Sequence, residues 1–209
     1  MALQNIDKAE FLSINRFAKR TPGLHGIMRF LSNEGVFIFI AFLIVAYLLV
    51  RFIPKWTTKN NMVKIAITGV GTVIAVGINQ PLTHIFKEPR PFNSLPHILV
   101  LINRVHDYSF PSDHGVMVGA VTAGLYLINP ILGTISLIIG LLIAFSRVYT
   151  AAHYPHDLIA GMIVGSVVVL LLYVLTKKPV AKLMDWLEKT PLKVFIGGNS
   201  KQNTTPSET

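Results

Sequence analysis

Ionisable side chains gather in two short segments, and each segment leads into a run of small apolar residues. The segments are residues 110–120 (FPSDHGVMVGA) and residues 146–161 (SRVYTAAHYPHDLIAG). His153 and Asp157 are four residues apart, the spacing of neighbours on one helix face. A carboxylate beside an imidazole fixes the tautomer of the ring and raises its basicity. His114 falls in the first turn of a predicted helix, where free N–H groups and the helix dipole favour an anion.

Two arginines complete a set of groups that could transfer a phosphoryl group. Arg90 precedes the first segment, and Arg147 lies at the start of the second. Guanidinium groups balance the charge on phosphoryl oxygens, while one imidazole attacks phosphorus and another protonates the leaving oxygen. If the fold brings the two segments together, His114 and His153 would flank one phosphorus atom.

Taken singly, these residues have simpler explanations. Ser112 and Asp113 would cap a helix N-terminus. Arg90 and Arg147 would anchor span ends at the membrane interface, and His114 would be a hydrogen-bonded interfacial histidine. The catalytic interpretation is favoured because such residues occur together, in one order and on one predicted side of a membrane.

A zinc site is a further alternative for the second segment. His153, His156 and Asp157 offer the imidazole and carboxylate ligands that zinc accepts. A metal site would still need another ligand, and the nearby arginines would repel a cation. We therefore expect no metal, and we leave His156 as a structural or supporting residue.

The composition of the chain indicates that lipid is its solvent. The 209 residues are 52% hydrophobic and only 14% charged, whereas soluble domains carry roughly 25% charged residues. The net charge of +9 comes from basic residues at the ends of apolar runs, as in membrane anchors. No basic platform interleaved with aromatic residues indicates a nucleic-acid partner. The absence of cysteine excludes disulfides and thiolate metal sites.

The apolar runs predict an all-α, polytopic bundle of membrane helices. A span needs about 20 mostly apolar residues. Five runs meet this need, and the pair Asn129-Pro130 predicts a tight turn between the third and the fourth. The five predicted spans are residues 35–53, 62–86, 114–128, 131–150 and 157–175.

The two ends of the chain differ from this bundle, although we expect residues 1–209 to form a single membrane domain. Residues 1–32 are predicted to be an amphipathic, interfacial segment, with two short helices broken at Thr21-Pro22-Gly23. A sixth span over residues 5–32 is the alternative. The charged start predicts no cleaved signal peptide, and residues 195–209 predict a disordered tail.

The distribution of basic residues predicts the orientation in the membrane. Lysines and arginines are frequent between the first two spans and after the fifth, so the positive-inside rule assigns these segments to the cytoplasm. Both polar segments then lie on the outer side. The glycine pairs Gly115/Gly119 and Gly161/Gly165 allow close helix packing, within one chain or between two, so the oligomeric state stays open.

Three motifs resemble the signatures of the type 2 phosphatidic acid phosphatase superfamily, which covers lipid phosphatases and vanadium haloperoxidases. They are PRP (residues 89–91), PSDH (residues 111–114) and SRVYTAAHYPHD (residues 146–157). Their order and spacing fit the family, and the third motif matches in full. The resemblance implies a helical core over about residues 60–176.

The resemblance also implies a role for each matching residue. His153 would be the nucleophile that forms a phosphohistidine, Asp157 would orient it, and His114 would act first as general acid and then as base. The phosphoryl oxygens would be held by Arg90, Ser112, Arg147 and the backbone N–H of Asp113. The resemblance implies neither a metal nor another cofactor.

Two positions depart from the family pattern. Thr83 stands where the family usually has a lysine, so Lys87, one helical turn along, would have to supply that phosphate contact. Asp113 stands where glycine is usual, and PSDH resembles a variant found in some bacterial undecaprenyl diphosphatases. An acidic group beside an anionic substrate is unfavourable unless it faces away or pairs with Lys87 or Arg90.

Together these features predict a metal-independent lipid phosphatase in a bacterial-type plasma membrane, with its site on the outer side. The predicted substrates are phosphatidylglycerophosphate and undecaprenyl diphosphate, while phosphatidic acid and diacylglycerol diphosphate stay open. One alternative is a transporter or channel with a proton relay through His114, His153 and Asp157. Another is a phospholipid-binding relative that has lost its chemistry, which the replacement at Thr83 would favour.

Overall fold

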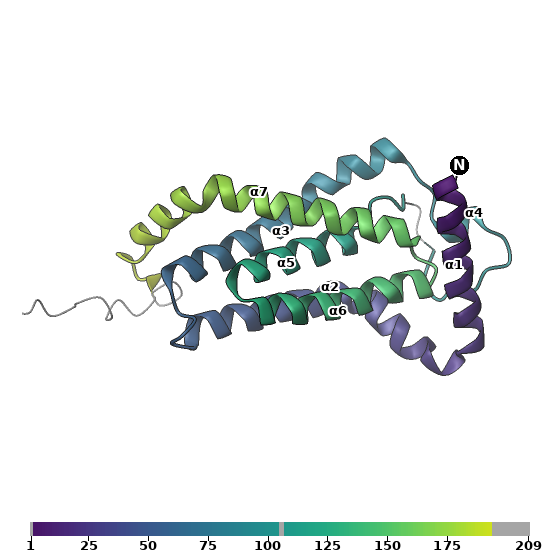
Figure 1. The fold of residues 1–209 in the computed structure, drawn as a ribbon, viewed down its shortest axis with the longest axis horizontal. Helices are drawn as coiled ribbons and strands as arrows, with labels where there is room; N and C mark the ends of the chain where they lie inside the picture. Colours follow the sequence, from purple (N-terminus) through teal and green to yellow (C-terminus); the bar gives the residue numbers. More distant parts are fainter. Residues whose placement is uncertain (1, 105–106, 194–209) are drawn as a thin grey trace, which may run out of the picture.

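The computed structural model describes residues 2–104 and 107–193, and side chains from residue 7 onward. The predicted tail of residues 195–209 lies outside the described residues. Figure 1 shows long helices that run side by side, with one helix across their end. The helices are α1 (Ala2–Arg20), η1 (Pro22–Leu24), α2 (His25–Phe52), α3 (Lys59–Phe86), α4 (Pro91–Ser94), α5 (Asp113–Ile128), α6 (Pro130–Tyr149) and α7 (Pro155–Leu187). Among the described residues, extended pairing is limited to a single bridge between Pro89 and Tyr108.

The N-terminal segment breaks where the sequence predicts, but its second half differs from the prediction. Helix α1 ends at Arg20, and the short η1 turn begins at Pro22. Residues 25–32 do not form a separate helix, because they are the first turns of α2, which continues to Phe52. No proline interrupts this stretch, so the amphipathic start extends into the apolar run without a break. Helix α1 crosses the end of the bundle (Figure 1).

In the part of the chain that the structure describes, four helical segments are long and apolar enough to cross a membrane: Pro22–Phe52, Lys59–Phe86, Pro130–Tyr149 and Pro155–Leu187. Helix α5 covers the third predicted span, but it has only 16 residues. At 1.5 Å per residue its length is about 24 Å, less than the roughly 30 Å of the hydrocarbon core. It packs against α3, α6 and α7, so its neighbours surround it in the bundle.

Helices α5 and α7 meet backbone to backbone through the two glycine pairs. A Cβ atom on Gly119 would lie 2.0 Å from the carbonyl oxygen of Met162, and one on Gly165 would lie 2.0 Å from that of Val116. No side chain fits in such a gap. The glycine pairs therefore pack against each other within one chain, and this contact brings the N-termini of the two helices together.

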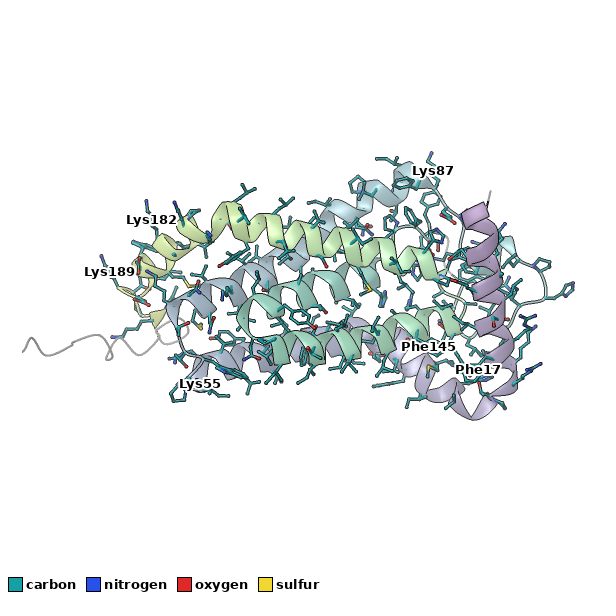
Figure 2. All side chains as sticks on the ribbon, viewed as in Figure 1. Phe17, Lys55, Lys87, Phe145, Lys182 and Lys189 are labelled. Carbon is teal, nitrogen blue, oxygen red and sulfur yellow. The ribbon has the colours of Figure 1, made fainter. Side chains whose placement is uncertain are left out.

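Basic residues gather at the opposite end of the bundle. Figure 2 shows Lys55, Lys182 and Lys189 at the end where α2 and α7 finish. An ion pair between Lys59 and Asp185 joins the start of α3 to the end of α7. The two basic segments used to predict the orientation therefore lie on the same side of the bundle, as expected.

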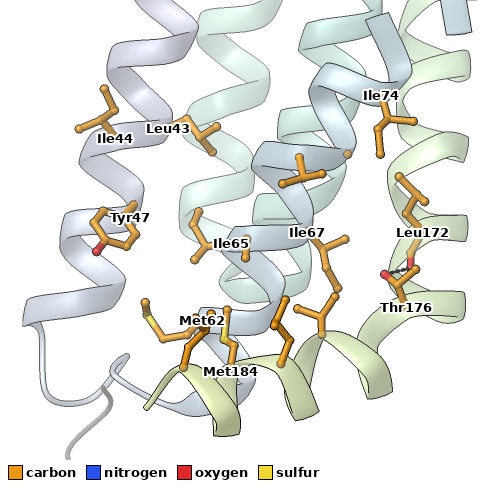
Figure 3. A pocket seen from close by; sticks show the side chains of 16 residues that line it. Leu43, Ile44, Tyr47, Met62, Ile65, Ile67, Ile74, Leu172, Thr176 and Met184 are labelled. Atoms are coloured by element: carbon orange, nitrogen blue, oxygen red, sulfur yellow. Dashed lines mark hydrogen bonds between the residues drawn. The ribbon is translucent and has the colours of Figure 1, made fainter. Parts of the chain in front are cut away.

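An apolar groove of about 680 Å³ opens between α2, α3 and α7 near the basic end. Figure 3 shows its lining, which includes Leu43, Met62, Ile74 and Leu172. The two polar segments lie at the other end, where α5 and α7 begin and α6 finishes (Figure 1). This apolar groove is thus separate from the groups that could do chemistry.

Candidate active site

The connection between α6 and α7 holds His153 below the protein surface. Directly after α6, Ala151 adopts a left-handed backbone conformation with φ of 67°, which costs a non-glycine residue about 1–3 kcal/mol. The N–H of Ala152 donates to the carbonyl oxygen of Arg147 at 2.9 Å and closes the turn. This turn leaves His153 only 3% exposed at the start of α7.

The hydrogen-bond partners of His153 define its tautomer. Its Nδ1 lies 3.0 Å from the carbonyl oxygen of Ser109, which can only accept, so Nδ1 carries the proton. Its Nε2 lies 3.0 Å from Nη1 of Arg90, which can only donate. The Nε2 lone pair is therefore free of a proton, as a nucleophilic imidazole requires.

The surroundings of His153 also keep the ring neutral. Burial lowers the pKa of His153 well below its usual value, and the positive charges of Arg147 and Arg90 lower it further. The carbonyl of Ser109 and the charge of Asp107 oppose this shift. A ring with a lowered pKa stays unprotonated through the physiological pH range.

Asp157 contacts His153 less directly than the spacing predicts. Its Oδ2 lies 3.4 Å from Nδ1 of His153, longer than a normal hydrogen bond. The same oxygen accepts from the N–H of Tyr154 at 2.8 Å and from the hydroxyl of Ser109 in a short contact. Asp157 thus fixes Ser109, and the backbone oxygen of Ser109 in turn fixes the imidazole.

Arg90 is buried and held by three groups. It is 6% exposed, and Nη1 donates to the carbonyl oxygen of Ala152 at 2.9 Å as well as contacting His153. Its Nη2 donates to a carboxylate oxygen of Asp107 at 2.8 Å. These contacts fix the plane of the guanidinium beside the imidazole.

Among the described residues, five buried polar atoms at this end of the bundle have no hydrogen-bond partner, and three of them are Ser112 Oγ, His114 Nε2 and Arg147 Nε. The Nη1 of Arg147 is anchored to the carbonyl oxygen of Ser32 at 2.9 Å. Arg147, His153 and Arg90 are all close enough to act electrostatically on His114. A buried polar group without a partner costs about 1–3 kcal/mol. The unpartnered groups therefore fit a ligand rich in acceptor oxygens, such as a phosphoryl group.

The two polar segments are tied together directly. The N–H of Ser112 donates to the carbonyl oxygen of Asp157 at 3.0 Å. A Cβ atom on Gly35 of α2 would lie 3.3 Å from Cδ2 of His114, so this glycine makes room for the ring. The fold thus brings His114, Ser112 and Arg147 to the same end as His153, as the sequence predicts.

The carboxylate of Asp113 faces away from the candidate site. It accepts from Nδ2 of Asn79 at 2.8 Å and from Nε2 of Gln80 at 3.1 Å. Its partners are therefore two amides of α3, and not Lys87 or Arg90. This arrangement removes the objection that an acidic group would repel an anionic substrate.

Thr83 and Lys87, the two candidates for the phosphate contact of the family lysine, lie away from the groups around His153. Thr83 is buried, and its hydroxyl donates to the carbonyl oxygen of Gln80 within α3 at 2.8 Å. Lys87 ends α3 in a left-handed conformation with φ of 52°. Its exposed side chain lines a separate cavity beside Glu88 and His156. The structure therefore gives neither residue a contact with the groups around His153.

Sequence reasoning missed the residues that hold the predicted ones in place. They are Ser32, Asn79, Gln80, Asp107 and Ser109, each polar and each far along the chain from its partner. Ser109 directly precedes the FPSDH segment, which is a weak signal for it. No spacing rule points to the other four, because their partners belong to different helices or loops.

The fold and the comparisons with known proteins define a membrane-embedded hydrolase of the lipid phosphatase class. A family model described as the PAP2 superfamily matches residues 64–180. A bacitracin transport permease protein, BcrC, from Bacillus licheniformis is 30% identical over 161 residues, which cover 77% of this chain and 75% of the relative. The undecaprenyl-diphosphatase of Sulfolobus acidocaldarius is 32% identical over 167 residues, covering 78% and 73%.

The fold is also that of a solved structure, a transmembrane PAP2-type phosphatidylglycerolphosphate phosphatase from Bacillus subtilis. The two match with a TM-score of 0.59 at 22% identity, over 85% of this chain and 87% of the other. The chain belongs to the PAP2 superfamily, and it is a membrane lipid phosphatase.

Proposed function

We propose that the protein removes the terminal phosphate of a polyprenyl diphosphate, with undecaprenyl diphosphate as its preferred substrate, through a phosphohistidine on His153. The proposal is carried by the buried imidazole of His153, whose Nε2 lone pair faces Arg90 beside unpartnered groups of Ser112, His114 and Arg147. The choice of lipid is supported by the name of a 32% identical relative. The likeness to the phosphatidylglycerolphosphate phosphatase, at 22% identity, supports the fold alone.

The first chemical step is attack of His153 Nε2 on the terminal phosphorus. Arg90 and Arg147 donate hydrogen bonds to the phosphoryl oxygens. The Ser112 hydroxyl and the backbone N–H of Asp113 donate to them as well. The N–P bond forms as the bridging P–O bond breaks, and protonated His114 gives its proton to the leaving oxygen of the lipid monophosphate.

The second step regenerates the enzyme. Neutral His114 takes a proton from a water molecule, and the water oxygen attacks the phosphohistidine. The new P–O bond forms as the N–P bond breaks, which releases inorganic phosphate and returns both histidines to their starting states. Ser109 and Asp157 hold Nδ1 of His153 in its protonated tautomer throughout.

The proposed topology has five spans, with the short α5 as the enclosed one, and α1 lying in the membrane interface. The basic end of the bundle would face the cytoplasm, so the site would open on the outer side of the plasma membrane. We further propose a single membrane domain with its family core over about residues 60–176. A cysteine-labelling test of Lys55→Cys and Lys87→Cys in intact cells should label only Lys87→Cys with an impermeant reagent.

A transport function with a proton relay has less support. Among the described residues, the buried acidic, arginine and histidine side chains are Asp7, Arg90, His153 and Asp157. All four belong to the end of the bundle where α7 begins. A relay across the bilayer would need such groups at successive depths.

The decisive experiment is phosphate release by the purified protein in detergent, with a chelator present. The substrate panel comprises undecaprenyl diphosphate, phosphatidylglycerophosphate, phosphatidic acid and diacylglycerol diphosphate, and the variants are His153→Ala and His114→Ala. We expect the highest kcat/KM on undecaprenyl diphosphate and near-complete loss in both variants. Full activity of His153→Ala would overturn the mechanism, and a preference for phosphatidylglycerophosphate would overturn the choice of lipid.

A further inference from the structure

A second cluster of ionisable groups lies behind Asp157, on the side away from His153. It comprises Asp7 of α1, Glu88 after α3, and His156 and Asp157 in the first turn of α7. The His156 ring is stacked between Phe110, with centroids 5.1 Å apart, and Tyr154, at 6.1 Å. The proposed phosphatase chemistry uses none of Asp7, Glu88 and His156.

Asp7 orients the ring of His156. One carboxylate oxygen lies 2.7 Å from Nδ1 of His156, and the other accepts from the backbone N–H of the same residue at 3.0 Å. Nε2 of the same ring lies 3.1 Å from Oε2 of Glu88, so each ring nitrogen faces an oxygen that only accepts, and each carries a proton. A zinc ion would displace the Nε2 proton, and the carboxylate at Nδ1 would then orient the ring as it does in metal-binding histidines.

Two carboxylate oxygens face Nε2 of His156 at distances that would also suit the ligands of a bound cation. Nε2 of His156 lies 3.1 Å from Oε2 of Glu88 and 3.4 Å from Oδ1 of Asp157, and ligand atoms of these three residues all lie within 4.8 Å of one another. Ligands around a tetrahedral zinc ion, with bonds of about 2.0–2.2 Å, are roughly 3.3 Å apart. The two separations measured from Nε2 are therefore close to those that a shared zinc ion requires.

The buried carboxylate supplies an independent sign of a missing ligand. Asp157 is fully buried, and its Oδ1 has no hydrogen-bond partner in the described part of the chain. That oxygen points toward His156 and not toward Ser109, which occupies the other oxygen. A buried carboxylate oxygen left without a partner is costly, and a cation at this point would satisfy it.

The cluster is open to a cavity of about 340 Å³, through which an ion could enter. Asp7, Glu88 and His156 line it, together with Lys8 and Lys87. The His156 side chain is 36% exposed there. Three carboxylates surround the ring, so a divalent cation that displaces the Nε2 proton would still meet an excess of negative charge. The cavity leaves a fourth ligand position to water.

We propose that Glu88, His156 and Asp157 form a zinc site, and that the bound ion inhibits the phosphatase. The ion would draw Oδ1 of Asp157 toward itself and so disturb the carboxylate that fixes Ser109 beneath His153. Binding of zinc does not depend on the proposed function. The inhibition rests on it, because it acts through Asp157.

The test titrates zinc chloride into the chelator-stripped protein in detergent, in phosphate-free buffer, by isothermal calorimetry. We expect one ion per chain and a loss of affinity of about tenfold or more in both His156→Gln and Glu88→Gln. The matched control is His84→Gln, an exposed histidine on α3 at the same end of the bundle, which should bind zinc as the wild type does. Equal binding by wild type and His156→Gln, or no binding at all, would overturn the site.

The second measurement follows phosphate release at buffered free zinc. Zinc should lower the rate of the wild type and of His84→Gln at least about tenfold at saturation, with a much smaller effect on His156→Gln and Glu88→Gln. Saturating zinc binding without loss of rate would overturn the inhibition. If no lipid phosphate is hydrolysed, the proposed function fails, while calorimetry still decides the zinc site.

Discussion

The two ends of the bundle differ in the side chains that gather there. The basic end holds a groove of about 680 Å³, and its walls are apolar side chains of α2, α3 and α7. At the other end, His153 and Arg90 are buried beside polar atoms that have no partner among the described residues. The volume of a hollow therefore does not by itself indicate where a polar ligand binds in this bundle. Buried polar groups without partners are the stronger indication, because a bound ligand can satisfy them.

The two ends are coupled by one helix contact. Gly119 and Gly165 let α5 and α7 touch along their backbones, and this contact starts at the site, where Ser112 is bonded to Asp157. The apolar half of the bundle thus determines the geometry of the polar half. Four experiments, from the largest expected effect to the smallest, would test this difference between the two ends.

The largest effect is expected at the imidazole that faces Arg90. His153→Asn should lower kcat by about 10⁴-fold or more, because the nucleophile is lost. The matched change at the other end is Val70→Ala in the groove, which removes only apolar surface and should leave kcat within about twofold. Phosphate release on one lipid diphosphate measures both, and comparable losses would show that the two ends are not functionally distinct.

A smaller loss is expected when the guanidinium fork beside His153 is removed. Arg90→Lys keeps the charge but cannot contact Asp107, Ala152 and a phosphoryl oxygen at once. We expect kcat/KM to fall by about 10²–10³-fold, the usual cost of one lost donor to a developing oxyanion. Arg29→Lys, an exposed arginine of α2, is the control. A loss below about threefold in Arg90→Lys would remove Arg90 from the site.

The glycine contact can be tested through stability. Gly119→Ala places a Cβ 2.0 Å from the carbonyl oxygen of Met162, and such overpacking costs about 1–3 kcal/mol. We expect a Tm several degrees lower, with activity reduced as α5 and α7 separate. Gly77→Ala is the matched control within α3, because nothing lies within 4 Å of its added Cβ and alanine favours a helix. Equal Tm values for the two variants would contradict the packing.

The smallest effect concerns pH. A free imidazole would be about 90% protonated at pH 5.5, which would cost roughly tenfold in activity. The pKa of His153 is lowered by burial and by Arg147 and Arg90, so its neutral form persists as pH falls through 6.5 and is lost only near the lowered pKa. The acid limb of the kcat/KM profile should therefore lie well below pH 6.5. Arg147→Gln removes one of these charges and should move that limb upward, and a limb at pH 6.5 in the wild type would contradict the assignment.

The sequence by itself determined the long helices, the break after α1 and the identity of the candidate site residues. Apolar runs set four of the long helices, Pro22 set the break after α1, and the spacing of His153 and Asp157 set them near the start of α7. The motifs also placed His114, Ser112, Arg90 and Arg147 in one functional group. These properties depend on side-chain type and on neighbours a few residues apart, so they can be read along the chain.

Only the tertiary structure decided which groups hold the site in place. Asp113 is bonded 34 residues away to Asn79, His153 is bonded 44 residues away to the carbonyl of Ser109, and His156 is bonded 149 residues away to Asp7. Such partners depend on how closely helices pack and where loops fold back over them. Because that packing is set by the whole bundle at once, no local pattern around Asp7 or Ser109 could have revealed their roles.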